Sequence, residues 1–328
     1  LFAHDTSSTG IIQCRSITGN TTVNIGFEPQ WILLKNVGSA EDWYIHDTMR
    51  GWPVSGDAKV LYPNLASAEG ATSQIYPNAT GFSTLIGSGT YIYMAIRRPN
   101  KPPTSGTQVY NAAIMSGSNP RLVSPGFSPD LFIGKTQDGS ANGGYISDRL
   151  RGNDPYLVIN TPNPESSGTN MSRFDMSNYF SQSFFGNSNI GWVFKRAPGF
   201  FDEVCYNGTG ALGSQQVPHN LTVTPEFVII KRRTAGSYQD WIVYHKDQPV
   251  YGAFLNSNAA WNTYDNPVYL PTSTKFNPNI NYAGAYSVTG PYVAYLFATL
   301  AGISKVGSYT GNGSTQNIEC GFAAGARF

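Results

Sequence analysis

The chain of 328 residues is long enough for two or three domains, each with a sizeable core. Aromatic residues make up 13% of it and charged residues only 12%, and together with frequent Gly and Pro this balance favours strands and turns over helices. Because 21 Lys and Arg oppose 20 Asp and Glu, the net charge is +1, which provides no field to attract nucleic acid or an anionic membrane.

The first elements along the chain have the patterns of β-strands. Residues 23–27 alternate apolar with small or polar side chains, as in a half-buried strand, whereas residues 31–34 form the continuous apolar run of a strand covered on both faces. Turn formers such as Thr18-Gly19-Asn20 and Pro77-Asn78 separate these runs, and residues 91–96 form a late strand. No segment shows a sustained 3.6-residue apolar period, so we expect an all-β fold.

Internal repetition is the strongest signal further along the chain. One block occurs three times, as FEPQWILLK (27–35), FSPDLFIGK (127–135) and VTPEFVIIK (223–231). Its proline recurs at intervals of 100 (129 − 29) and 96 (225 − 129) residues. A second block, WYIHDTMRG (43–51), recurs as GYISDRLRG (144–152) and more loosely as WIVYH (241–245). Since both blocks keep one register, they indicate structural repeats of just under 100 residues.

The repeats divide the chain as follows. Residues 1–10 resemble the end of a preceding module, and residues 303–328 resemble the start of a fourth. Between them we define repeat 1 (11–104), repeat 2 (105–200) and repeat 3 (201–302). The start at Leu1 contains neither an initiator Met nor a basic leader region, so we expect a longer parent chain. Several short strands and many turns in each repeat predict tandem β-sandwich modules of the jelly-roll or concanavalin A-like kind.

The repeated motifs resemble those of a known family. The stretch QVPHNLTVTPEFVIIK (216–231), the DTMRG and DRLRG corners and the joint RAPGFF (196–201) are similar to an all-β domain of unknown function. That domain recurs in long tail-associated proteins of bacteriophages, especially marine ones. The similarity covers essentially the whole chain but weakens over residues 161–176 and at the third corner, HKDQP (245–249). It implies a protein of a virion tail, fibre or baseplate, with lectin-like sandwich domains, and it implies no catalytic residue.

Motifs for metal binding and catalysis do not occur. The four histidines lack metal-ligand spacing, and His46 and His245 are expected to complete hydrogen bonds in turns. Cys14, Cys205 and Cys320 form an odd set with no C-x-x-C spacing, which predicts free thiols. The sequence therefore predicts a protein that is not an enzyme and needs no metal or cofactor.

Charged residues recur at fixed repeat positions. Glu28, Asp130 and Glu226 share one position, which suits a common turn or cap better than one active site. The pairs Asp47 with Arg50 and Asp148 with Arg151 predict exposed ion pairs at the corners, each contributing about 0–1 kcal/mol.

Aromatic side chains are the remaining candidates for contacts with a ligand or partner. Trp31 lies within an apolar run and is expected in the core. Five other aromatic residues lie closer to polar turns, where they could be displayed; they are Trp43, Trp52, Trp241, Trp261 and Tyr264. Trp261 is the strongest candidate because it is unique to its repeat, whereas a repeated Trp more often anchors packing.

Two classes of function follow from these observations. The first is a structural virion protein whose repeats serve as spacer and interaction modules, with other virion subunits as partners and a homo-oligomer such as a trimer as its assembly. The second is a carbohydrate-binding adhesin that recognises host surface glycans through many weak sites. Either would be a virion component acting outside the cell, with no nucleic acid and no membrane insertion, and a polysaccharide-cleaving enzyme ranks third.

Overall fold

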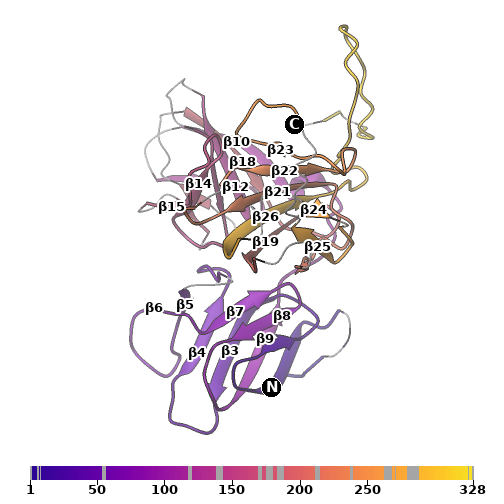
Figure 1. Cartoon of the computed structure of the whole chain (residues 1–328). Coiled ribbons are helices and arrows are strands. Elements are labelled where there is room, and N and C mark those ends of the chain that lie inside the picture. The colour runs from indigo at the N-terminus through magenta and orange to yellow at the C-terminus, as the bar shows by residue number, and fades with distance from the viewer. Residues whose placement is uncertain are drawn as a thin grey trace.

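The computed structural model spans residues 1–328 and confirms that the protein is all-β (Figure 1). The structure describes all residues except 1, 6, 8, 54–56, 117–119, 138–142, 169–171, 175–179, 183–187, 211–214, 237–238, 262–267, 270, 279–287, 324 and 327–328. The described residues form 26 strands, all paired antiparallel, and one short 3-10 helix, η1 (Gly106–Gln108). Among these residues no helix is long and apolar enough to cross a membrane.

Each repeat contributes one larger sheet, and the strand order is the same in all three. In repeat 1 the order is β1 (Ile12–Thr18), β9 (Thr90–Arg97), β3 (Pro29–Asn36) and β4 (Trp43–Asp47). In repeat 2 it is β10 (Tyr110–Ser116), β18 (Ser188–Phe194), β12 (Leu131–Thr136), β13 (Tyr145–Asp148), β14 (Pro155–Val158) and β15 (Ser166–Ser167). In repeat 3 it is β19 (Phe201–Gly208), β26 (Gly290–Phe297), β21 (Phe227–Arg232), β22 (Ile242–His245) and β23 (Ala253–Phe254).

A smaller sheet of three strands accompanies each larger one, again in a common order. These sheets are β2 (Thr22–Asn24), β8 (Gly81–Thr84) and β7 (Ile75–Asn78); β11 (Arg121–Val123), β17 (Phe180–Gln182) and β16 (Ser172–Arg173); and β20 (Val217–Pro218), β25 (Lys275–Pro278) and β24 (Val268–Tyr269). Repeat 1 adds a hairpin of β5 (Ala58–Val60) and β6 (Gly70–Thr72). Within each repeat a hydrophobic cluster draws residues from both sheets.

The strand β3 is covered on one face only. Ile32 and Leu34 are fully buried in the cluster of repeat 1, whereas Trp31, Leu33 and Lys35 point to the other face and are half-buried. The prediction of a strand covered on both faces is therefore wrong for repeat 1. The equivalent strand of repeat 3, β21, is covered on both faces and is buried from Val228 to Arg232, because repeat 2 covers its second face.

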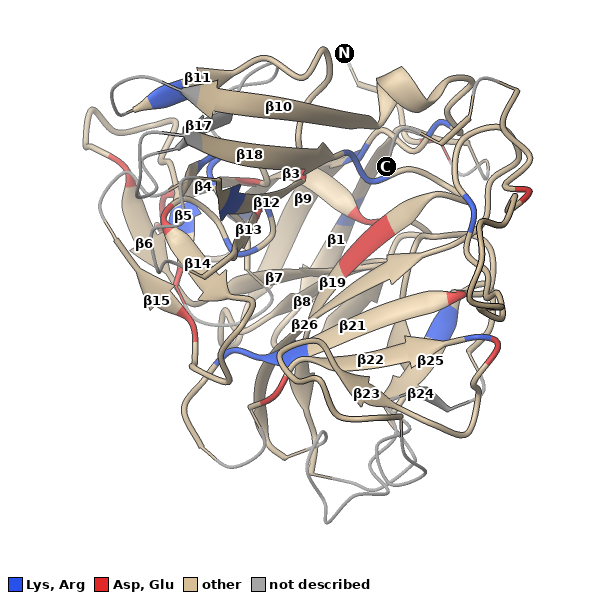
Figure 2. Cartoon of the chain, turned by 90° about the horizontal axis from the view of Figure 1, so that it is seen from above, with Lys and Arg blue, Asp and Glu red and all other residues tan. Residues whose placement is uncertain are grey.

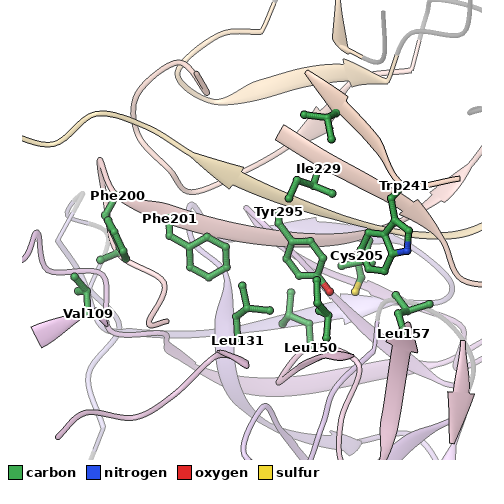
Figure 3. Close-up of a cluster of buried hydrophobic side chains, with 14 residues drawn as sticks. Val109, Leu131, Leu150, Leu157, Phe200, Phe201, Cys205, Ile229, Trp241 and Tyr295 are labelled. Atoms are coloured by element: carbon green, nitrogen blue, oxygen red, sulfur yellow. The ribbon is translucent and has the colours of Figure 1, made fainter. Parts of the chain in front are cut away.

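Repeats 2 and 3 pack against each other through the outer faces of their larger sheets, and repeat 1 lies to one side of this pair and contacts it there (Figure 1). The cluster between them contains Leu131, Leu150 and Leu157 of repeat 2, over which Tyr295 and Trp241 of repeat 3 lie (Figure 3). Removing apolar surface from water contributes about 25 cal/mol per Å², so this shared core stabilises the pair strongly.

Candidate functional site

The second sequence block forms a corner with the same geometry in repeats 1 and 2. The Asp47 carboxylate accepts hydrogen bonds from the backbone N–H of Arg50 (2.9 Å) and from its Nε (2.7 Å), and Arg50 Nη2 donates to the Ile45 carbonyl (3.2 Å). Asp148 and Arg151 repeat this pattern at 2.9 and 2.5 Å. The predicted corner ion pairs are therefore confirmed.

The two corners differ in burial, which corrects the expectation that both are exposed. The side chains of Asp47 and Arg50 are 17% and 16% exposed, whereas those of Asp148 and Arg151 are 0% exposed. Repeat 3 covers the second corner, where Tyr295 Oη donates to Asp148 Oδ2 at 2.6 Å. Although burial alone would lower it, the Asp148 carboxylate holds the pKa of Arg151 well above its ordinary value.

The corners of repeats 1 and 2 meet backbone to backbone. Gly51 and Gly152 end the two corners with φ of +91° each, a conformation that glycine adopts readily. A Cβ atom placed on Gly51 would lie 2.5 Å from the Cα of Gly152, so no side chain fits at position 51. Arg149 also crosses this contact, with Nη1 3.3 Å from Met49 Sδ.

A cleft of about 430 Å³ lies beside this contact. Its lining comes from both repeats and from the segment between them, and it consists of Gln30, Trp31, Asp47, Thr48, Met49, Arg50, Arg98, Pro99, Ser128, Asp130, Arg149 and Lys195. Four of these residues are basic and two are acidic, so the lining has a formal charge of +2. The cleft is the candidate functional site because it combines an aromatic face with several hydrogen-bond donors.

The donors of the cleft are engaged to different degrees. Arg149 is held by the carbonyls of Pro129 (Nε, 3.0 Å) and Phe174 (Nη1, 2.5 Å). In contrast, Arg98 is 8% exposed and its Nε has no hydrogen-bond partner among the described residues. The ammonium group of Lys195 likewise has none in the part of the chain that the structure describes. The guanidinium of Arg98 nevertheless forms ion pairs with Glu28 (3.8 Å) and Asp202 (3.9 Å), so Lys195 rather than Arg98 is available to an acceptor from outside.

Behind the cleft, Arg196 joins all three repeats. Its Nη1 and Nη2 donate to the two carboxylate oxygens of Glu28 in repeat 1, both at 2.7 Å, and its Nε donates to Asp202 Oδ1 in repeat 3 at 2.7 Å. Burial alone would lower the pKa of Arg196, but the carboxylates of Asp202 and Glu28 hold it well above its ordinary value. We call Glu28, Arg196, Asp202 and Asn220 the three-repeat junction, because Asn220 completes it with hydrogen bonds to Glu28 (3.0 Å) and Asp202 (2.7 Å).

The acidic position shared by the three repeats acts as a cap in two of them. Asp130 Oδ2 accepts from the backbone N–H of Arg196 (2.8 Å), and Glu226 Oε2 accepts from that of Thr299 (2.8 Å). Each donor lies two residues after the closing strand of its repeat. In repeat 1 the Glu28 side chain instead binds Arg196 across the junction.

The charges of the described chain are scattered, with an acidic segment at the start of β19 as an exception (Figure 2). In this segment Glu203 is fully buried, and neither carboxylate oxygen has a hydrogen-bond partner among the described residues. Burial raises the pKa of Glu203 well above its ordinary value, and the nearby carboxylate of Asp148 raises it further.

The aromatic residues chosen from the sequence do not line the cleft. Trp52 and Trp241 are fully buried, which corrects the expectation that they could be displayed. Trp52 Nε1 donates to the Ile75 carbonyl (2.8 Å) in the core of repeat 1, and Trp241 Nε1 donates to the Val158 carbonyl (3.0 Å) across the interface of repeats 2 and 3. Both indoles are therefore used for packing.

The other aromatic candidates lie elsewhere. Trp43 is half-buried on the outer face of β4, and Trp261 is 39% exposed with its ring nearly perpendicular to that of His245. Tyr264 lies outside the described residues. Trp31, expected in the core, is half-buried and lines the cleft. The signal that could have located the cleft was the repeated corner motif, since residues 47–50 line it.

The histidines are placed in two ways. His245 Nδ1 accepts from the backbone N–H of Asp247 (3.1 Å), as expected for a turn. His46 is instead buried, stacks on Trp52 with ring centroids 5.8 Å apart, and lies 2.9 Å from the Lys59 carbonyl through Nδ1. Burial lowers the pKa of His46 to about 4. Within the described ranges no group of three or more His, Cys, Asp or Glu side chains could hold a metal ion.

The chain belongs to the family described as "Domain of unknown function (DUF7483)", which matches residues 6–99 and 193–324. These ranges contain most of repeat 1 and all of repeat 3, whereas most of repeat 2 lies outside them. No curated protein and no solved structure matches the chain.

Proposed function

We propose that the chain is a non-enzymatic structural protein of a virion, part of a bacteriophage tail fibre or another tail-associated assembly. Its repeats are tandem β-sandwich modules of the jelly-roll or concanavalin A-like kind, and they act as spacer and interaction modules with other virion subunits. Such a protein is located in the virion, outside the cell.

The three-repeat junction is the observation that carries this proposal. A spacer must keep its modules in one arrangement, and here a buried guanidinium binds carboxylates of repeats 1 and 3 at 2.7 Å. Removing one partner of such a pair leaves an uncompensated buried charge at a cost of about 3–5 kcal/mol, so reorientation of repeat 1 is strongly opposed.

Antibody labelling of phage particles tests whether the chain is part of a virion tail. Antibodies raised against the recombinant chain should decorate the tails of particles from a phage whose genome encodes it, in negatively stained micrographs. Particles without the chain, judged by labelling and by mass spectrometry of purified virions, would overturn the proposal.

Small-angle X-ray scattering tests the spacer role separately. We expect the wild-type chain to scatter as one rigid body and Arg196→Met to show a wider range of dimensions. Lys59→Met is the matched control, because Lys59 forms only an exposed ion pair with Glu69 at 3.3 Å. A wild-type chain as variable as Arg196→Met would contradict a rigid spacer.

A carbohydrate-binding adhesin is the second candidate, and the cleft favours it. Trp31 lines the cleft, where an aromatic ring can stack against a sugar, while the Lys195 ammonium can bind an acidic group. The ligand class is therefore an anionic host glycan. On a glycan array we expect carboxylated sugars to bind and Trp31→Ala to weaken binding at least tenfold, whereas Trp261→Ala should not. Glycan binding that Trp31→Ala leaves unchanged, or no binding by the wild type, would exclude the cleft as a glycan-binding site.

A further inference from the structure

The outer face of the larger sheet of repeat 1 carries a row of apolar side chains. Strand pairing aligns one residue from each strand across the sheet, and the central row consists of Cys14, Met94, Leu33, Ile45 and Leu61. The first four side chains are half-buried, and Leu61 is 38% exposed. Neighbouring rows add Trp43 beside Lys35 and Ile92, which is 43% exposed.

The same row is covered in the other two repeats. At the positions of Met94, Leu33, Ile45 and Leu61, strand pairing places Trp192, Ile133, Ile146 and Leu157 in repeat 2, and Tyr295, Ile229, Val243 and Ala253 in repeat 3. Five of these eight residues are less than 9% exposed, and six belong to or pack on the shared cluster of repeats 2 and 3. The fold therefore uses this face to pair one repeat with another.

The outer face of repeat 1 contains residues equivalent to both partners of the contact between repeats 2 and 3. Trp241 of repeat 3 occupies the position of Trp43 in repeat 1. Its Nε1 donates to the carbonyl of Val158 in repeat 2, next to Leu157. Leu157 in turn corresponds to Leu61, since each pairs with the central-row residue of the neighbouring strand. A face with both Trp43 and Leu61 is self-complementary, which is the requirement of a twofold interface between identical chains.

The surroundings of Trp43 also match those of Trp241. The backbone N–H of Trp43 donates to Asn64 Oδ1, and that of Trp241 donates to Asn256 Oδ1, both at 2.9 Å. Repeat 1 thus holds its Trp in the same local arrangement as repeat 3, although repeat 3 buries it completely and repeat 1 does not.

We infer that the outer face of repeat 1 binds the same face of a second copy of the chain, with Trp43 of each copy against Leu61 of the other. The chain then forms a twofold dimer whose interface reproduces the contact of repeats 2 and 3. This inference does not rest on the proposed virion setting, because it follows from the packing of the repeats alone.

Sedimentation of the full chain over a range of concentrations tests the dimer. We expect a reversible dimer for the wild type and, for Leu33→Asp, a dissociation constant at least about thirtyfold higher, as for the loss of a central interface residue. Leu85→Asp is the matched control, since Leu85 is 56% exposed in repeat 1 but follows β8 in the smaller sheet. Equal melting temperatures for the two variants would show that both are folded.

Alkylation of cysteines gives an independent readout. Cys14 lies in the central row, whereas Cys320 lies outside the three repeats, and both are partly accessible. Raising the protein concentration should slow alkylation of Cys14 and leave that of Cys320 unchanged. A wild type that stays monomeric at about 100 μM, or a Leu33→Asp chain that dimerises as well as Leu85→Asp, would overturn the inference.

Discussion

Arg196 and Glu28 lie 168 positions apart in the chain and form a bidentate ion pair in which both N–O distances are 2.7 Å. Their side chains are 3% and 7% exposed, so little water can compensate either charge when its partner is removed. The relationship makes the joint between repeat 1 and the other two sensitive to single substitutions.

Neutralising Glu28 should therefore destabilise the protein far more than neutralising an exposed glutamate. We expect Glu28→Gln to lower the free energy of unfolding by about 3–5 kcal/mol, since it leaves the buried Arg196 short of a counter-charge. The exposed pair partner Glu69 provides the control, because Glu69→Gln should cost less than about 1 kcal/mol. Urea denaturation measures both, and equal losses would show that the junction is not energetically special.

Removing both charges should recover part of that loss. In the double variant Glu28→Gln with Arg196→Met no buried charge is left unpaired between these two positions, so its cost should be smaller than the sum of the single costs. A double-mutant cycle by urea denaturation gives the coupling energy. Strict additivity would mean that the two side chains do not interact in solution.

The two corners should respond differently to the same substitution. Asp148→Asn should cost about 3–5 kcal/mol, because Arg151 and Tyr295 are buried around it, whereas Asp47→Asn should cost about 1 kcal/mol at its partly exposed corner. Thermal unfolding of both variants provides the comparison. A larger loss for Asp47→Asn would contradict the burial of the second corner.

Glu203 should make the protein less stable as the pH rises. Its pKa is raised in the folded state by burial and by Asp148, so the folded protein retains a proton that the unfolded chain releases. The stabilisation is complete below the ordinary glutamate pKa of 4.5 and is lost as the pH rises from there through the folded-state pKa.

Glu203→Gln tests this directly, since glutamine mimics the neutral acid at every pH. We expect the variant to melt at a higher temperature than the wild type at pH 7 and at the same temperature near pH 4. Glu165→Gln is the contrast, because burial would raise the Glu165 pKa but Arg233 and Arg151 hold it below its ordinary value. A wild type whose melting temperature does not fall relative to Glu203→Gln with rising pH would refute the assignment.

His46 has the opposite pH dependence. Burial lowers its pKa to about 4, so the folded protein excludes a proton that the unfolded chain binds near pH 6.5. Its contribution is present above pH 6.5 and is lost as the pH falls toward 4, by roughly 3 kcal/mol over that window. The imidazole resonances of His46 in NMR spectra should titrate near pH 4, and titration near 6.5 would show that the ring is exposed.

The equivalent strands and the corner ion pairs followed from local patterns, whereas the use of the aromatic residues did not. The recurrence of proline at 29, 129 and 225 predicted equivalent strands, and the Asp-x-x-Arg spacing predicted an ion pair, since both depend on residues close in sequence. The burial of Trp241 depends on repeat 2, because its indole donates to the carbonyl of Val158, which lies 83 positions earlier in the chain. No sequence pattern near position 241 indicates that contact.

The cleft was unpredictable for a related reason. Trp31 alternates with buried residues along β3, and the pattern alone does not say whether its face is covered. The cleft exists because the corner of repeat 1, the linker at Arg98 and the end of β18 converge. The corner contributes four consecutive residues, 47–50, but the other lining residues come from separate segments, so the corner motif alone does not define the site.

The contact between Gly51 and Gly152 has a consequence for how the chain can change over time. Where repeats 1 and 2 touch at Gly51 and Gly152, the two backbones are too close for a Cβ atom at position 51. Substitutions in the cleft lining that leave this glycine in place can alter the chemistry of the cleft without forcing the two repeats apart at this point.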